Sequence, residues 1–301
     1  MTLKITLLSL VMTLVAVSSA FACTSFALYG SQVVYGMNFD YFAVPLKFLI
    51  ESCRGMNVFH LSFLFDRTVD DPEYKGYFAR TCGMNAKGLF CASQEIEPYI
   101  EGRKQTGADQ MHIDDHYDTL NTEATVKQVR EQIRGRQWIQ HLGPSIHHLF
   151  ADAGGNAMVT ETDNTANFIT GIRENFIVMS NFANHSLAGK PYTAAAGAGA
   201  DRYVAAYEYI LKHMDAFGVD NGFELLESAS MTGPDFETLC SMVFQPRTGE
   251  IYIALHRDFG TVWKVCLDRK TIEPYRGYTK FFRRRLGDAG LPDTDLQALS
   301  V

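Results

Sequence analysis

The sequence predicts an α+β domain in which antiparallel strands and helices pack in layers. Many short β-rich runs are joined by hairpin turns, and two amphipathic helical segments are inserted among them. The order is strands, helix, strands, helix, strands, which does not favour a doubly wound parallel sheet. With 301 residues, no visible internal repeat and no long linker, residues 23–301 are predicted to form a single domain.

Residues 1–22 have the layout of a secretory signal peptide. Lys4 provides a short positive start, the stretch 5–17 is mostly apolar, and the end is Ala20-Phe21-Ala22. The apolar run is short for a membrane span and no basic stop follows it. We therefore expect the leader to be removed before Cys23 and the protein to be exported, to the periplasm or the medium.

The first half of the remaining chain is rich in predicted strands. Two β-rich runs within 24–41 meet at Gly30-Ser31, which indicates a hairpin. Another run covers 56–65, and residues 76–96 contain two runs around the turn sequence MNAKG, which favours an antiparallel pair. Residues 100–122 are polar and lack a clear period, so we expect a surface loop there.

Two helices are predicted. The first begins at Thr122 and is supported by Val126, Val129, Ile133 and Trp138 near helical spacing. The second covers 198–214, where Tyr203 and Ile210 mark one apolar face.

The remaining runs are predicted strands. Residues 145–162 contain two strands around the turn Gly154-Gly155-Asn156, and residues 166–172 and 175–183 follow them. Residues 240–268 form a predicted meander with a Pro-Arg-Thr-Gly turn between its first two strands.

The net charge and the cysteine content restrict the classes of function that this protein can have. The formal net charge of −7 argues against a nucleic-acid partner, and the basic run 283–285 is interpreted as a solvated stretch. Six cysteines are sparse for this length and have no CxxC spacing, so neither a stapled scaffold nor a zinc site is indicated. Four are expected to be core thiols, with one disulfide left open: Cys82, Cys91, Cys240 and Cys266.

Cys23 would become the first residue once the leader is removed. Its α-amine would then have an ordinary pKa of about 7.7–8 and its thiol one of about 8.5. The amine can take the thiol proton directly or through water, so a nucleophile would need no histidine. A lipid attachment point and half of a disulfide are the other interpretations of a cysteine at this position.

Several motifs further along the chain favour the nucleophile. Cys23-Thr24 is followed by GMNFD at 36–40, and then come MNAKGLFCAS, SIHHLFADAGGNAMVTE, IVMSNFAN and GADRYVAAY in order. This ordered set resembles the choloylglycine hydrolase and penicillin V acylase family of linear amide C–N hydrolases, which includes related acyltransferases. The resemblance spans residues 23–268. It implies a four-layer αββα sandwich of the N-terminal-nucleophile hydrolases, with two antiparallel sheets, and a reaction that needs neither cofactor nor metal.

The resemblance also implies roles for individual residues. Cys23 would be the nucleophile and, through its amine, the general base, and Asp40 would hold the amine or thiol by a hydrogen bond. Asn181 would donate to the oxyanion together with a backbone N–H near Asn85 or Cys91. Arg202 would orient Cys23 or anchor the hydrogen-bond network.

Three residues are expected to line the substrate site: Met37, Asn85 and Glu95. Met37 departs from the family, which usually has an arginine there that favours the thiolate. Because methionine carries no charge, efficient hydrolysis of bile-salt-type substrates comes into question.

The expected substrate is a small acylated amine. A bile-salt conjugate, penicillin V, an N-acyl amino acid and an N-acyl homoserine lactone are all candidates, and a homo-oligomer, dimer or tetramer, stays open. The alternative is a lipid-anchored or catalytically inactive binding protein of the same fold, since lipidation would block both thiol and amine. A zinc site at His112, His116, His147 and His148 is not favoured, because the first pair lies in a segment of loop composition.

Overall fold

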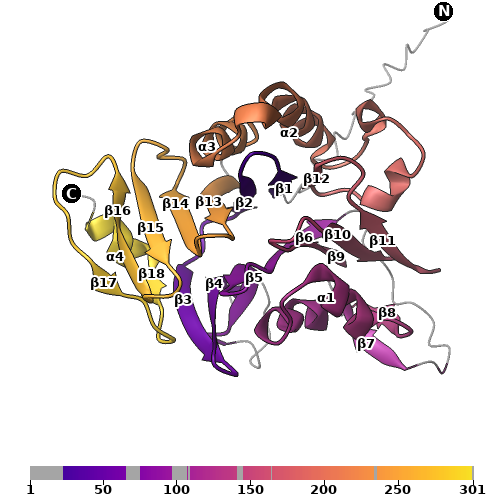
Figure 1. Cartoon of the computed structure of the whole chain (residues 1–301), viewed down its shortest axis with the longest axis horizontal. Coiled ribbons are helices and arrows are strands. Elements are labelled where there is room, and N and C mark those ends of the chain that lie inside the picture. The colour runs from indigo at the N-terminus through magenta and orange to yellow at the C-terminus, as the bar shows by residue number, and fades with distance from the viewer. Residues whose placement is uncertain are drawn as a thin grey trace, which may run out of the picture.

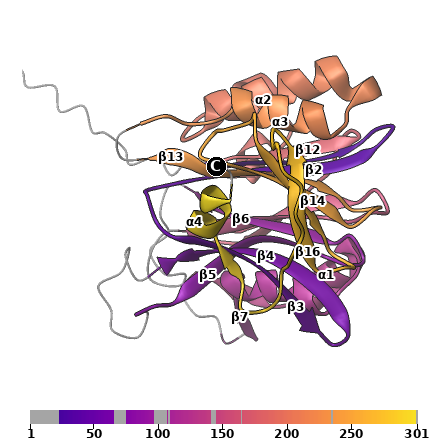
Figure 2. The ribbon, with the colours of Figure 1, turned by 90° about the vertical axis from the view of Figure 1, so that its left-hand side faces the viewer.

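The computed structural model describes residues 23–65, 75–96, 107, 109–140, 145–163, 165–233 and 236–299. The leader lies outside the described residues. Two eight-stranded sheets are stacked face to face, and helices cover the outer face of each (Figures 1 and 2). Neighbouring strands within both large sheets are antiparallel. This architecture confirms the predicted αββα sandwich.

The first sheet has the strand order β12-β1-β2-β13-β14-β15-β16-β17. Its strands in chain order are β1 (Thr24–Tyr29), β2 (Val33–Tyr41), β12 (Phe176–Met179), β13 (Glu237–Gln245), β14 (Glu250–Leu255), β15 (Val262–Cys266), β16 (Thr271–Arg276) and β17 (Arg284–Arg285). The predicted hairpin of β1 and β2 is present, with Ser25 opposite Met37.

The second sheet has the strand order β11-β10-β9-β6-β5-β4-β3-β18. Its strands are β3 (Leu46–Cys53), β4 (Met56–Leu64), β5 (Phe78–Asn85), β6 (Phe90–Ile96), β9 (Ser145–Ala151), β10 (Ala157–Thr162), β11 (Asn167–Gly171) and β18 (Leu291–Pro292). The antiparallel pairs predicted within 76–96 and 145–162 are both present. A small parallel pair, β7 (Gln110–His112) with β8 (Gln137–Ile139), stands apart from the two sheets.

The helices form the two outer layers. α2 (Ala200–His213) and α3 (Val219–Ser228) cover the first sheet, whereas α1 (Val126–Ile133) lies on the second (Figure 1). A short α4 (Asp293–Ala298) follows β18. Within the described residues, 3₁₀ segments include η3 (Ile113–Asn121), η4 (Asn184–Leu187), η5 (Tyr192–Ala194) and η6 (Met214–Ala216). No helix among the described residues is long and apolar enough to cross a membrane.

Three apolar cores correspond to the three interfaces between layers. Between the sheets, β2 contributes Tyr35, Met37 and Phe39. Toward α2 and α3, the opposite face of the same strand contributes Val34. The third core lies between the second sheet and the segments α1 and η3. Because both faces of β2 are covered, all nine of its residues are buried.

Gly36 shows why the GMNFD motif begins with glycine. A Cβ atom built on Gly36 would lie 2.3 Å from the ring of Phe26 on the neighbouring strand β1. Glycine therefore allows an aromatic ring to pack directly on the backbone of β2.

The structure corrects two segments of the prediction. Within 100–122, the described part contains β7 and the 3₁₀ segment η3, which buries Ile113, Tyr117 and Leu120, so it is not a surface loop. A 3₁₀ helix lacks the 3.6-residue period, which explains why the pattern was not visible. The first helix begins only at Val126, after the N-cap Thr125, and Trp138 belongs to strand β8.

Candidate active site

Cys23 lies directly before β1 and is buried, with 5% of its surface exposed. Its thiol donates to the backbone carbonyl oxygen of Asp40 over 3.7 Å. The Ser180 hydroxyl donates to the carbonyl oxygen of Cys23 over 3.2 Å. Cys23 is therefore held by Asp40 of β2 and by Ser180, the residue directly after β12.

The surroundings of Cys23 keep its thiol protonated. Burial raises the pKa of the Cys23 thiol far above its ordinary value, and the charges of Asp40 and Glu95 raise it further. A hydrogen bond to the Asp40 backbone and the charge of Arg202 act in the opposite direction. The thiol therefore needs an adjacent base before it can attack a carbonyl carbon.

Asp40 is completely buried near the end of β2. Its Oδ1 accepts a hydrogen bond from the Thr238 hydroxyl over 2.5 Å, whereas Oδ2 has no partner among the described residues. Burial raises the pKa of Asp40 to about 7, although the Thr238 hydrogen bond and the charge of Arg202 oppose this shift. In this structure Asp40 contacts the thiol through its backbone, and its carboxyl has one oxygen available for a further donor.

Asn181 connects three elements at the site. Its Nδ2 donates to the carbonyl oxygen of Glu95 at the end of β6 over 2.8 Å. Its Oδ1 accepts from Nη2 of Arg202, in the first turn of α2, over 3.2 Å. The two contacts determine which end of the amide is the donor, and one Nδ2 hydrogen remains for another acceptor.

Arg202 is part of the hydrogen-bond network around Asn181. Besides Asn181, it contacts the Met231 sulfur through Nη1 over 3.6 Å, and its charge lowers the pKa of both Cys23 and Asp40. Gly199 makes room for this guanidinium. The Gly199 backbone has φ +72°, and a Cβ there would lie 2.5 Å from Nη2 of Arg202 and 2.2 Å from Oγ of Ser180.

The three residues expected to line the substrate site lie in different places. Met37 is fully buried in the core between the sheets, which also contains Cys23. Glu95 lies near the end of β6 beside Asn181, and its Oε2 is buried without a partner among the described residues. Burial raises the pKa of Glu95 to about 8.

Asn85 is not brought to Cys23. It ends β5 at the turn that precedes β6, so it lies at the opposite end of β6 from Glu95. Its backbone N–H donates to Leu89, and its side chain is fully engaged in local hydrogen bonds to the turn and to the η3 region. A polar side chain with every donor and acceptor used inside the fold has a structural role there.

Thr238 and Ser180 are site residues that the sequence did not indicate. Thr238 contacts Asp40 from β13, which is 198 residues further along the chain. Ser180 belongs to the predicted strand-and-turn segment, but nothing in its sequence distinguishes it from any other strand-end serine. The sheet order β12-β1-β2-β13 brings Ser180 to Cys23 and Thr238 to Asp40.

The predicted core thiols and the disfavoured zinc site can also be examined. All six cysteines are free, and Cys82, Cys91, Cys240 and Cys266 are buried as expected. In the described part of the chain, no group of three or more histidine, cysteine or acidic side chains could hold a metal ion.

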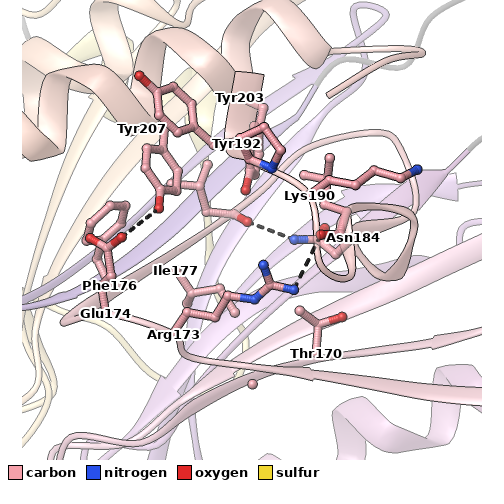
Figure 3. Close-up of a pocket in the computed structure, with 14 residues that line it drawn as sticks. Thr170, Arg173, Glu174, Phe176, Ile177, Asn184, Lys190, Tyr192, Tyr203 and Tyr207 are labelled. Atoms are coloured by element: carbon pink, nitrogen blue, oxygen red, sulfur yellow. Dashed lines mark hydrogen bonds between the residues drawn. The ribbon is translucent and has the colours of Figure 1, made fainter. Parts of the chain in front are cut away.

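A cavity of about 270 Å³ does not have Cys23 among its lining residues (Figure 3). It is bounded by the stacked rings of Tyr192 and Tyr207, 4.2 Å apart, and by Arg173 and Asn184. Many of its polar groups bond within the protein. Tyr207 donates to Glu174, Arg173 to the carbonyl of Leu187 and Asn184 to that of Val178. Since none of its lining residues is a predicted catalytic residue, we interpret it as a gap between β12 and α2.

Comparison with solved structures finds the same fold in two kinds of amide hydrolase. Two of these solved structures are variants of the conjugated bile acid hydrolase from Clostridium perfringens. A cysteine-to-alanine variant has a TM-score of 0.63 at 13% identity, with 88% of this chain and 97% of that chain covered. An arginine-to-leucine variant has a TM-score of 0.64 at 14% identity, with coverage of 88% and 98%.

The third structure is penicillin V acylase from Agrobacterium tumefaciens, with a TM-score of 0.60 at 15% identity. The match covers 81% of this chain and 91% of that one. No protein-family model matches the sequence, and no curated protein does. At these identities the likeness establishes the fold, and it agrees with the family that the motifs resemble.

Proposed function

We propose that this chain, after removal of residues 1–22, is an exported hydrolase of linear amide C–N bonds with Cys23 as its nucleophile. The observation that carries the proposal is the meeting of Cys23, Asp40, Asn181 and Arg202 at the ends of separate elements. The similar structures described above are variants of a conjugated bile acid hydrolase and a penicillin V acylase, which supports the same class of reaction.

The proposed reaction has two halves. In the first, the Cys23 α-amine accepts the thiol proton, the sulfur attacks the amide carbonyl carbon, and an S–C bond forms. The C–N bond then breaks, and the proton passes to the leaving amine. In the second, the α-amine takes a proton from water, whose oxygen attacks the thioester carbon. The S–C bond breaks, the acid is released and the thiol is restored.

The surrounding residues would support both halves without moving far. Asn181 already has its amide nitrogen oriented by Arg202, so its remaining N–H can stabilise the oxyanion. The free Oδ2 of Asp40 can accept a hydrogen bond from the new α-amine. Candidate acyl donors remain bile-salt conjugates, penicillin V, N-acyl amino acids and N-acyl homoserine lactones.

The first test is the intact mass and N-terminal sequence of protein purified from the exported fraction. We expect a chain that begins at an unmodified Cys23. Incubation with p-nitrophenyl esters of several acyl groups should then add one acyl mass at Cys23. The Cys23→Ser variant should lose turnover by at least about a thousandfold, whereas Cys53→Ser, a half-buried thiol on the second sheet, should retain it.

Two results would contradict the proposal. A diacylglyceryl or N-acyl mass on Cys23 would block both reacting groups and favour the lipid-anchored alternative. An unmodified N-terminus that no ester acylates would favour a catalytically inactive binding protein.

A further inference from the structure

Thr238 lies between Asp40 and the segment that follows α3. It is fully buried near the start of β13. The backbone N–H of Met231 donates to Oγ1 of Thr238 over 2.8 Å, and the Thr238 hydroxyl donates to Oδ1 of Asp40 over 2.5 Å. The backbone N–H of Thr238 in turn donates to the carbonyl oxygen of Met231 over 3.2 Å. Two hydrogen bonds with the Met231 backbone therefore hold Thr238 against Asp40.

These contacts fix the direction of the Thr238 hydroxyl hydrogen. A hydroxyl group has one hydrogen to donate and two lone pairs that accept. Because the Met231 N–H can only donate, it occupies a lone pair and leaves the hydrogen for Asp40 Oδ1, its one acceptor among the described residues. Oδ1 is then an acceptor whether the carboxyl is ionised or protonated. Any proton on Asp40 lies on Oδ2, which is buried without a partner in the described part of the chain.

The Asp40 carboxyl and the Cys23 thiol lie on opposite faces of the first sheet. The thiol is in the core between the sheets, whereas Asn38, two residues before Asp40, donates to Leu226 of α3 on the other face. Thr24 is opposite Asn38 in an antiparallel pair, so the N-terminal end of Cys23 points along β2 toward Asp40. The α-amine that removal of the leader would expose is a backbone group at this end. The carboxyl can therefore meet the amine although it does not contact the thiol.

From this geometry we propose that Thr238 is a positioning residue for the proposed reaction, because its hydroxyl holds Asp40 Oδ1 and reserves Oδ2 for the α-amine of Cys23. The inference rests on the proposed amide hydrolysis and adds the residue that orients the carboxyl. When the α-amine takes the thiol proton it becomes an ammonium group, and a carboxylate oxygen directed at it stabilises that charge. Thr238 acts on the reaction only through Asp40.

Two cations act on Asp40 in addition to the Thr238 hydroxyl. The charges of Arg202, on α2, and Arg257, directly after the end of β14, lower the pKa of Asp40, as the Thr238 hydrogen bond does, whereas burial raises this pKa to about 7. The Cys23 thiol, the other titratable group nearby, is neutral until it loses its proton. Removal of the hydroxyl leaves both cations in place, so loss of the hydrogen bond should raise the pKa of Asp40 further.

The test compares Thr238→Val with Thr238→Ser in the acylation of Cys23, with the p-nitrophenyl ester that reacts fastest with the wild type. Valine has the shape of threonine but no hydroxyl, so we expect the acylation rate constant at pH 7 to fall by about tenfold to a hundredfold. The acidic limb of the pH–rate profile should move to higher pH. Serine keeps the hydroxyl, so Thr238→Ser should retain the wild-type rate and profile.

Two further variants separate this role from an effect on the fold. Thr81→Val removes a buried hydroxyl that donates to the carbonyl oxygen of Ser93 in the second sheet, and it should leave the rate unchanged. In an Asp40→Asn background, Thr238→Val should reduce the rate by less than about threefold, because the group through which Thr238 acts is already altered. If valine beside the carboxyl prevents folding, Thr238→Ala replaces it with the same expectations.

The wild-type ester reaction distinguishes failure of this inference from failure of the proposed function. If no ester acylates wild-type Cys23, the hydrolase proposal falls and this inference falls with it. If the wild type is acylated but Thr238→Val keeps its rate and pH profile, only this inference is overturned. The same holds if Thr238→Ser is as impaired as Thr238→Val, or if Thr238→Val costs as much in the Asp40→Asn background as in the wild type.

Discussion

Around Cys23, the proposed nucleophile, each side chain of the candidate site is held by a neighbour from a distant part of the chain. Cys23 contacts Asp40, Asp40 contacts Thr238, and Asn181 is held between Glu95 and Arg202. Such an arrangement pre-orients donors and acceptors before a substrate arrives, and this is the main way in which a site stabilises developing charge. The contribution of Asn181 can be measured directly.

Asn181→Ala is expected to reduce kcat for amide hydrolysis by about a hundredfold to a thousandfold, because it removes one oxyanion donor. Asn181→Asp keeps an oxygen for Arg202 but loses the donor, so it should be similarly impaired. Steady-state kinetics on both variants would check this. Wild-type kcat in Asn181→Asp would show that the residue only anchors Arg202.

At the scale of elements, the start of α2 is shaped by the site rather than by helix capping. Gly199, the N-cap residue, is in the left-handed region and makes no side-chain capping bond. A side chain there would meet Arg202 and Ser180. Glycine at this N-cap therefore leaves room for the contact between Arg202 and Asn181.

We expect Gly199→Ala to destabilise the fold by roughly 1–2 kcal/mol through the left-handed backbone alone, and to displace Arg202. Gly189→Ala is the matched control, since Gly189 has φ +75° but no atom within 4 Å of the added Cβ. Chemical denaturation and ester acylation should be compared. An equal loss of acylation rate in the two variants would argue against the contact with Arg202.

A second connection between elements joins β10 to the segment that follows Asn181. Glu161 of β10 is fully buried and accepts hydrogen bonds from His147, from the His185 ring and from the backbone N–H groups of Asn184 and His185. Burial alone would raise the pKa of Glu161, but the hydrogen bonds from His147 and His185 hold it at about 2. The ionised carboxylate thus fixes η4 next to the site.

Glu161→Gln should lower the free energy of unfolding by about 3 kcal/mol at pH 7, because it leaves buried donors without a charged acceptor. The folded pKa lies below the ordinary value of 4.5, so this stabilisation is complete above pH 4.5 and is lost as the pH falls toward 2. Urea titrations at pH 5 and pH 3 should show a smaller difference between variant and wild type at the lower pH. A difference independent of pH would contradict the assignment.

For the molecule as a whole, the sandwich is stabilised by three apolar interfaces and not by covalent links. All six cysteines are free in the structure, although export would permit disulfides. A domain of this size buries enough apolar surface to fold without such links.

We therefore expect six titratable thiols in denatured protein that has never been exposed to reductant, and an unfolding midpoint that reductant does not change. Cys53, which is only partly buried, should react with a general thiol reagent in the native state before the four buried core thiols Cys82, Cys91, Cys240 and Cys266 do. A count of four thiols would instead reveal a disulfide.

The local sequence pattern was sufficient to predict much of the fold. Alternating apolar runs and their turns predicted the β1–β2, β5–β6 and β9–β10 hairpins, since such pairing depends on neighbouring residues. Other segments were missed or misread: β3 and α3 were not predicted, and the buried η3 was taken for a loop because a 3₁₀ segment lacks the 3.6-residue period. Helix α1 was predicted too long, because Trp138 fell near its spacing although it belongs to β8.

The candidate site, like the fold, could be predicted only in part from the sequence. The resemblance of the ordered motifs to a known family singled out four residues of the site: Cys23, Asp40, Asn181 and Arg202. The contacts among these residues depend on one feature of the fold, and so does the presence of Thr238 and Ser180 in the site. Strands β12, β1, β2 and β13 are neighbours in one sheet. Asn85 is a counterexample. Its motif resembles that of the family, but the residue lies at the opposite end of β6 from Glu95. Contacts between residues so distant in the chain arise from sheet order and burial, which no local pattern encodes.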